Sequence, residues 1–154
     1  MNILILRVSK GRCRWSDQGV EEYLQRIGRQ LPVQEILLKP ANPKLSLEER
    51  RASETKQILQ RLKPDDRLVV LDERGEVATT EAVCSWVQES MNSGVKRLIF
   101  AIGGPFGHHE VIRTKAWKNL ALSRMVLNHE LARLTLCEQL YRIHTLIYGG
   151  NYHH

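Results

Sequence analysis

The apolar segment LIFAI at residues 98–102 runs directly into a loop rich in glycine and proline, and this junction constrains the fold most strongly. Gly103, Gly104 and Pro105 come first, and Gly107 follows two residues later. Such a run bounded by such residues is typical of a buried strand that enters a tight turn. Because glycine lets a backbone approach a ligand closely, we interpret the loop as a strand-end binding loop. A plain strand-to-helix turn is the alternative.

The loop matches neither of the two common phosphate-binding motifs. The residues after Gly103 do not continue in the G-x-G-x-x-G register of dinucleotide-binding folds. Gly104 and Gly107 are too close together for a P-loop, and His108 and His109 stand where that motif continues toward lysine and serine or threonine.

Apolar runs alternate with helical patterns along the chain, which predicts an α/β fold with a mostly parallel sheet and flanking helices. We expect strands at residues 2–8, 33–38, 67–71 and 98–102, and helices at 17–29, 47–62, 81–92 and 129–148. Residues 120–127 are short and mixed. The last helix is apolar on more than one side, which indicates burial against the sheet and a second surface, such as another subunit.

Polar residues mark the expected starts of these helices. We predict that Ser16, Thr80 and Asn128 cap the first, third and last helices, and that Ser46 and Glu49 form a capping box before the second. The dense charges of the second helix, Glu54 included, indicate a solvated face. Ligands bind at the carboxyl ends of strands in such sheets, so the loops after residues 71 and 102 are the predicted walls of a site.

Composition limits the function further. With 154 residues, of which 42% are hydrophobic, one domain spanning residues 1–154 is expected. A net charge of +6 favours a polyanionic partner, and RNA is the natural candidate. The basic loop at residues 9–15 either contacts phosphate or is simply solvated, and the tail at 149–154 either folds over a site or frays.

Metal and membrane binding are not indicated. Three widely spaced cysteines form no C-x-x-C pattern and are expected to be ordinary thiols, and the histidine pairs lack nearby ligands, so no metal is predicted. The first residues form neither a signal peptide nor a membrane span. A cytosolic protein is therefore expected.

Five motifs in this order resemble the small SPOUT methyltransferases that modify N3 of a pseudouridine in large-subunit (23S) ribosomal RNA with S-adenosylmethionine. They cover nearly the whole chain and are LDERG at 71–75, IGGPFG at 102–107, LSRMVLNHELAR at 122–133, EQLYR at 138–142 and NYH at 151–153. The resemblance implies a C-terminal trefoil knot over roughly residues 98–154 and a homodimer. It also implies a ribosomal substrate and a reaction that needs no metal.

The resemblance assigns site residues to this sequence. The residues carried over as cofactor-binding are Leu71, Gly103, Leu122, Ser123, Arg124, Met125, Val126 and Leu127. The residues expected to act on the RNA are His129, Arg133, Tyr152 and His153. We expect Arg133 to bind phosphate or developing charge, and His153 or His129 to contact the base or relay its proton. A structural helix cap is the alternative for His129.

Three positions depart from the pattern of this family. Ser9 stands where Gly is usual, Asn128 replaces Pro or a small hydroxyl residue, and His154 replaces a terminal Lys or Arg. Two other functions remain open. The chain could be a basic RNA-binding factor without turnover, or a SPOUT methyltransferase acting on transfer RNA.

Overall fold

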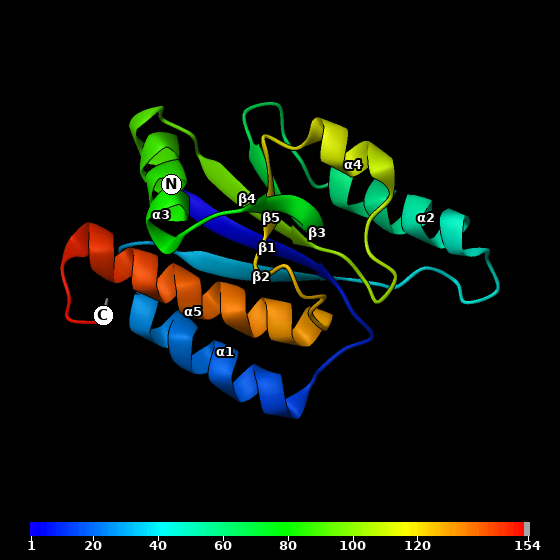
Figure 1. Ribbon diagram of the computed structural model, residues 1–154, viewed down its shortest axis with the longest axis horizontal. Coiled ribbons are helices and arrows are strands. Elements are labelled where there is room, and N and C mark those ends of the chain that lie inside the picture. The colour runs from blue at the N-terminus through cyan, green and yellow to red at the C-terminus, as the bar shows by residue number, and fades with distance from the viewer. Residues whose placement is uncertain (153–154) are drawn as a thin grey trace.

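The computed structural model describes residues 1–152, in which helices flank a five-stranded sheet (Figure 1). The strands are β1 (Asn2–Val8), β2 (Val33–Leu38), β3 (Arg67–Val77), β4 (Arg97–Ile102) and β5 (Lys118–Ala121). The helices are α1 (Arg14–Ile27), α2 (Leu47–Leu59), α3 (Thr80–Asn92), α4 (Glu110–Lys115) and α5 (His129–Tyr148). The strand order is β2-β1-β4-β3-β5, and all neighbours are parallel. The predicted α/β class is confirmed.

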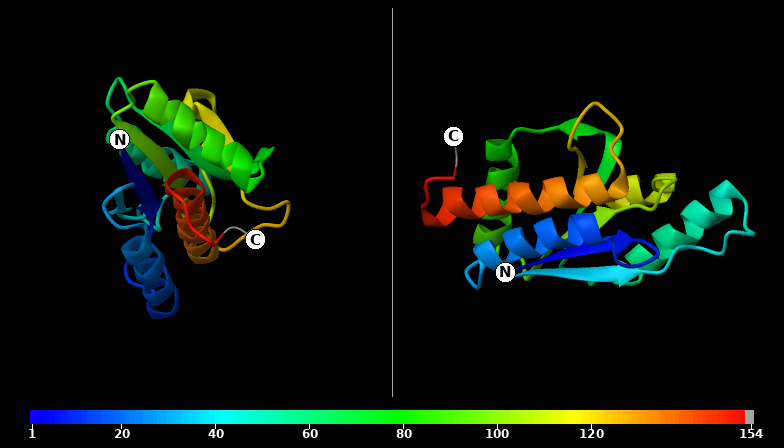
Figure 2. Two further views of the ribbon diagram at one scale, coloured as in Figure 1. Left: turned by 90° about the vertical axis from the view of Figure 1, so that its left-hand side faces the viewer. Right: turned by 90° about the horizontal axis from the view of Figure 1, so that it is seen from below.

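Helices cover both faces of the sheet, as Figures 1 and 2 show. Ile3 and Ile5 of β1 belong to the core under α1, α3 and α5, whereas Leu4 and Leu6 belong to the core under α2 and α4. Successive side chains of a strand point to opposite faces. A strand buried on both faces must therefore be apolar at nearly every position, which explains the continuous apolar pattern of residues 2–8.

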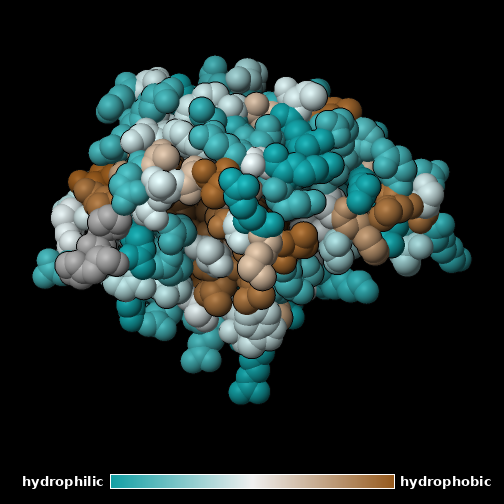
Figure 3. Space-filling model, in the orientation of Figure 1, coloured by the Kyte–Doolittle hydropathy of each residue, from teal (hydrophilic) through white to brown (hydrophobic). Residues whose placement is uncertain are grey.

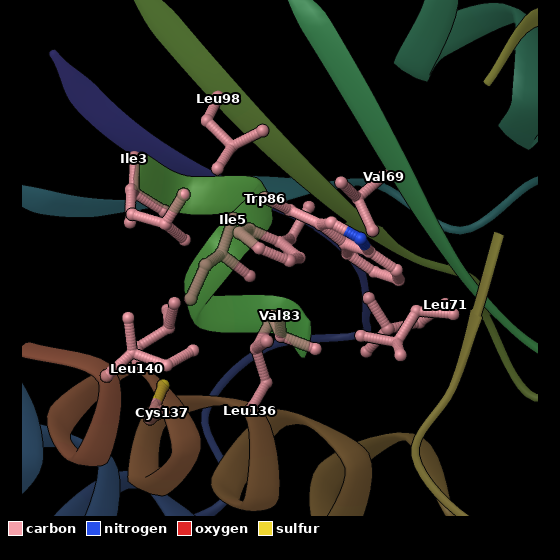
Figure 4. Packing of buried hydrophobic residues seen from close by; sticks show 14 of the residues in the cluster. Ile3, Ile5, Val69, Leu71, Val83, Trp86, Leu98, Leu136, Cys137 and Leu140 are labelled. Carbon is pink, nitrogen blue, oxygen red and sulfur yellow. The ribbon is translucent and has the colours of Figure 1, made fainter. Parts of the chain in front are cut away.

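Helix α5 packs against the sheet and lies between two other helices. Figure 4 shows Leu136, Cys137 and Leu140 pointing toward Ile5 of the sheet and toward Trp86 of α3. Helix α1 packs along the other side of α5. Neighbours on three sides account for its broad apolar surface, although Leu131 and Leu146 remain exposed.

Helix caps confirm some predictions and correct others. Ser46 and Glu49 form the predicted capping box, and Asn128 accepts a hydrogen bond from the Glu130 amide at 2.8 Å. The predictions for Ser16 and Thr80 were wrong, because α1 begins after Cys13 and α3 after Thr79. The Thr79 side chain accepts from the Ala82 amide, which explains the shift of one residue.

The α2 surface is not wholly solvated. Glu54 is buried and its Oε1 accepts a hydrogen bond from the Ala41 backbone amide at 3.0 Å. This carboxylate fastens the connection after β2 to α2, and for Glu54 the prediction of a solvated position was wrong. Both α1 and α2 also end before the predicted boundaries, at Ile27 and Leu59.

Strand β3 extends beyond the predicted end at Leu71. Its pairing with β5 is interrupted, since Leu120 pairs with both Leu71 and Glu76. The residues between these two positions therefore leave the regular ladder at the carboxyl edge of the sheet. Helix α4 and strand β5 were not predicted, because elements this short show no clear hydrophobic period. The trefoil knot stays a prediction.

Candidate functional site

A cavity of about 630 Å³ lies at the carboxyl end of β4, beside the point at which β3 leaves its regular pairing with β5. Its walls come from three segments, at residues 71–73, 102–108 and 120–129, with Arg51 and Ala132 at its margins. Its size falls within the range of small-molecule sites. The two strand-end loops predicted as walls do line the same cavity.

The loop after β4 needs glycine for two physical reasons. Gly107 has φ 73°, which side chains disfavour, and its amide donates to the Gly104 carbonyl at 3.0 Å. At Gly103, a Cβ would lie 3.1 Å from the Gly107 carbonyl carbon and 3.2 Å from the His108 ring. A side chain there would make closer contacts than nearly all real Cβ atoms do, so the loop would have to shift by a few tenths of an ångström to accept one.

Helix α2 holds this loop from outside. Arg51 Nε donates to the Phe106 carbonyl at 2.7 Å, and the Arg50 guanidinium carbon lies 4.3 Å from the centre of the Phe106 ring. The loop is therefore tied at its tip as well as at its glycines, which prepares the wall before any ligand binds.

His108 lies behind the glycines and was not predicted as a site residue. Its side chain lines the cavity, is only 5% exposed, and its Nε2 has no hydrogen-bond partner among the described residues. Burial lowers the pKa of His108, although the Asp72 carboxylate and the Ala101 and Leu71 carbonyls oppose this effect. The imidazole is therefore neutral at pH 7.

Asp72 brings a buried carboxylate to the cavity wall, also unpredicted. Burial raises its pKa, but the opposing hydrogen bonds from Arg74 outweigh burial and leave the pKa lowered. Arg74 donates from Nε and Nη2 at 2.9 Å, and Arg113 Nε lies 3.9 Å away. The sequence signal that could have found Asp72 is its position directly after the apolar run that ends at Leu71.

Seven of the eight residues expected to bind the cofactor line the cavity. They are Leu71, Gly103, Leu122, Ser123, Met125, Val126 and Leu127. Arg124 is exposed and is not part of the wall. Within this segment the Met125 amide donates to Ser123 Oγ at 3.0 Å, which helps to shape the turn before α5.

His129 begins α5 and lines the cavity. Its Nε2 lies 3.6 Å from Oε1 of the buried Glu130. Burial raises the pKa of Glu130, but the Ser16 hydroxyl, donating at 2.7 Å, and the cations Arg7 and Arg133 outweigh it, so the pKa is lowered. A fixed anion therefore lies beside the imidazole.

Arg133 belongs to a buried ion network and is absent from the cavity lining. It is 4% exposed and donates to both oxygens of Glu35, at 2.7 and 2.6 Å, and to Asp17 Oδ1 at 2.6 Å. Its Nη1 also lies 3.3 Å from Glu130 Oε2. The network joins α1, β2 and α5 beneath His129.

Tyr152 lies far from the cavity of its own chain. Its ring centre is 4.6 Å from that of Tyr141, and its carbonyl accepts from Arg142 at 3.1 Å. These contacts hold the tail at the end of α5 that is opposite to His129. The 20 residues of α5 span roughly 30 Å. His153 lies outside the described residues.

No helix among residues 1–152 is both long and apolar enough to cross a membrane. Over the same residues, no group of three or more His, Cys, Asp or Glu side chains is arranged to hold a metal ion.

Comparison with known proteins identifies the family. Residues 1–153 match the sequence model of a family described as predicted SPOUT methyltransferase. Proteins named ribosomal RNA large subunit methyltransferase H are similar over 100% of this chain: 38% identical in Geobacter sp. (strain M21), covering 99% of the relative, and 39% in Trichlorobacter lovleyi, covering 100%. The relative from Cytophaga hutchinsonii is 36% identical, again over the full length of both chains. The chain therefore belongs to the SPOUT methyltransferase family.

Proposed function

We propose that this protein transfers a methyl group from S-adenosylmethionine to N3 of a pseudouridine in the RNA of the large ribosomal subunit. The observation that carries the proposal is the cavity at the carboxyl edge of the sheet, walled by the segments that the family resemblance assigned to the cofactor. The full-length similarity to large-subunit methyltransferases supports the choice of ribosomal RNA over transfer RNA.

The cavity fits S-adenosylmethionine chemically. Leu71, Ile102 and Leu122 supply apolar surface for an adenine ring, and the bare backbone at Gly103 leaves main-chain groups free to bind its polar edge. Glu73 adds an acidic group for the positively charged part of the molecule, whereas both oxygens of Asp72 are already bound by Arg74. The cofactor supplies a methyl group already activated on a sulfonium.

The protein's own task is to align the base and to accept the N3 proton. We assign the second task to His129, whose Nε2 lies 3.6 Å from Glu130 Oε1, and not to His108, which is buried behind the glycines. We assign Arg133 a positioning role, because its donors are engaged by Glu35, Asp17 and Glu130 beneath His129. This assignment replaces the predicted contact of Arg133 with RNA.

A homodimer explains why the tail lies far from the cavity. Tyr152 and His129 are at opposite ends of α5 within one chain, so a tail that completes a site must complete the site of a second copy. Apolar side chains gather on the face that α5 crosses (Figure 3), and Met125, Val126 and Leu131 are exposed. Burying this surface between two copies would stabilise the pair. We place the enzyme in the cytoplasm with its ribosomal substrate.

Titration calorimetry tests the cofactor, first with S-adenosylmethionine and then with S-adenosylhomocysteine. Saturable binding at one site per chain is expected. A folded protein that binds neither compound, but binds ribosomal RNA, would instead be a non-enzymatic RNA-binding factor.

The substrate is tested separately by incubating the protein with labelled S-adenosylmethionine and large ribosomal subunits from cells that lack its gene. Label at N3 of one pseudouridine in the large-subunit RNA is expected. Label in transfer RNA but not in subunits would overturn the ribosomal assignment.

A further inference from the structure

Trp15 is the most exposed aromatic side chain among the described residues. It is 56% exposed, against 39% for Phe106 and 37% for Tyr148. The other two tryptophans, Trp86 and Trp117, pack edge to face with ring centres 6.4 Å apart. The core therefore uses two of the three indoles and leaves Trp15 in solvent.

Three basic residues come just before this tryptophan in the sequence. Lys10, Arg12 and Arg14 are exposed, and none of them makes a hydrogen bond or ion pair with the described residues. Most other arginines of the chain are paired, as Arg97 is with Asp66. Lys10, Arg12 and Arg14 belong to the basic loop at residues 9–15. No carboxylate among residues 1–152 forms an ion pair with these three cations.

The basic loop lies beside the cavity. It follows β1, and the glycine loop follows the parallel neighbour β4. Both loops therefore begin at the carboxyl ends of adjacent strands. Ser9 Oγ donates to Glu130 Oε1 at 3.4 Å, and Glu130 adjoins the cavity residue His129. Figures 1 and 2 show the β1–α1 connection and the start of α5 at the same end of the molecule.

The loop is anchored rather than free at its base. The Cys13 amide donates to Asp17 Oδ2 at 3.0 Å, and the other oxygen of Asp17 accepts from the buried Arg133. Trp15 is in the first turn of α1, directly after this anchor. The backbone that carries the exposed indole is thus fixed at the start of α1.

We propose that Trp15 stacks on an unpaired base of the RNA strand next to the nucleotide in the cavity, while Lys10, Arg12 and Arg14 contact its phosphates. This proposal rests on the proposed function. An aromatic ring among unpaired cations is the combination that binds single-stranded RNA, because bases stack on the ring and phosphates pair with the cations. An apolar protein patch would not use the cations. A lipid surface could use both features, and the full-length similarity to ribosomal RNA methyltransferases favours RNA over lipid.

The first test compares wild type with Trp15→Ala and Trp15→Phe, using large ribosomal subunits from cells lacking the gene. We expect Trp15→Ala to raise the dissociation constant for subunits about tenfold, and Trp15→Phe to restore most of the affinity. Affinity for S-adenosylmethionine, measured by calorimetry, and the oligomeric state, measured by light scattering, should not change.

The second test removes three positive charges from the basic loop, and its control removes three positive charges elsewhere. In Lys10→Gln/Arg12→Gln/Arg14→Gln, the affinity for subunits should fall and should depend less steeply on salt, because fewer counterions are released. The matched control is Arg29→Gln/Lys63→Gln/Lys96→Gln, which removes three exposed cations near the amino ends of the strands. It should keep a salt dependence closer to that of wild type.

Three outcomes would overturn the proposal. They are an unchanged affinity for subunits in Trp15→Ala, dissociation of the oligomer in that variant, and photo-cross-linking from Trp15→benzoylphenylalanine to ribosomal protein instead of RNA. The proposed function fails separately, if wild type neither binds S-adenosylmethionine nor methylates subunits. If wild type methylates subunits and Trp15→Ala binds them equally well, the proposed function stands and only the proposed RNA contact of the basic loop is rejected.

Discussion

Arg133 of α5 donates two parallel hydrogen bonds to Glu35 of β2, from Nε to Oε1 at 2.7 Å and from Nη2 to Oε2 at 2.6 Å. Such a fork is specific to the planar guanidinium, since an ammonium group cannot reproduce both bonds. The pair ties the start of α5, which carries His129, to the sheet. We therefore treat it as the support of the candidate site.

The variant Arg133→Lys tests this support. It keeps the charge but loses the fork, and we expect a loss of about 2–3 kcal/mol in the free energy of unfolding, measured by urea denaturation. Arg26→Lys is the control, because its pair with Glu22 is exposed and should contribute less than about 1 kcal/mol. Unchanged stability together with lost methylation would place Arg133 at the RNA instead.

The variant Gly103→Val tests the cofactor wall. A Cβ at this position would already lie 3.1 Å from the Gly107 carbonyl carbon and 3.2 Å from the His108 ring, so the larger valine would displace the loop that forms the cavity wall. We expect S-adenosylmethionine binding to become undetectable by calorimetry while the oligomeric state persists.

Gly94→Ala controls for a general effect of losing glycine. Gly94 has φ 71° and open space around its Cα, and it follows α3 at the opposite edge of the sheet. It should lose only about 1 kcal/mol of stability and keep its cofactor affinity. Retained affinity in Gly103→Val would move the cofactor site elsewhere.

His108 should make stability depend on pH. Burial lowers its pKa in the folded protein, whereas the unfolded chain binds a proton near pH 6.5. Below that pH the unfolded state therefore gains a proton that the folded state lacks, and stability falls with a slope of up to about 1.4 kcal/mol per pH unit.

The test compares urea denaturation of wild type and His108→Leu at pH 7 and pH 5. The variant should lose less stability between the two values, by about 1 kcal/mol or more. Equal losses in both proteins would show that His108 is protonated in the folded state as easily as in the unfolded chain.

Mixed dimers test whether the tail acts on the partner. Gly103→Val damages the cavity and Tyr152→Ala damages the tail, so we expect both homodimers to lose methylation. A dimer with one copy of each variant keeps one intact cavity facing one intact tail, if the tail acts between subunits. We expect it to recover about half of the wild-type rate, measured with ribosomal subunits. An inactive mixed dimer would mean that cavity and tail act within one chain.

The sequence by itself determined the α/β class, four of the five strands, the four longer helices and the walls of the cavity. These features depend on local patterns. Apolar runs, capping residues such as Ser46 and Asn128, and the glycines at 103–107 determine backbone conformation within a few residues of themselves. The segment at 122–127 needed the family resemblance, because its mixed pattern has no clear period.

Only the tertiary structure decided which side chains are partners. Arg133 is 98 residues from Glu35 and 116 residues from Asp17 in sequence, and Ser16 left its expected cap for Glu130, 114 residues away. His108 became a buried neutral group through the packing of the glycine loop, and α5 placed Tyr152 away from the cavity. Periodicity shows that a position is buried, but the charges that meet there depend on how distant segments of the chain pack together.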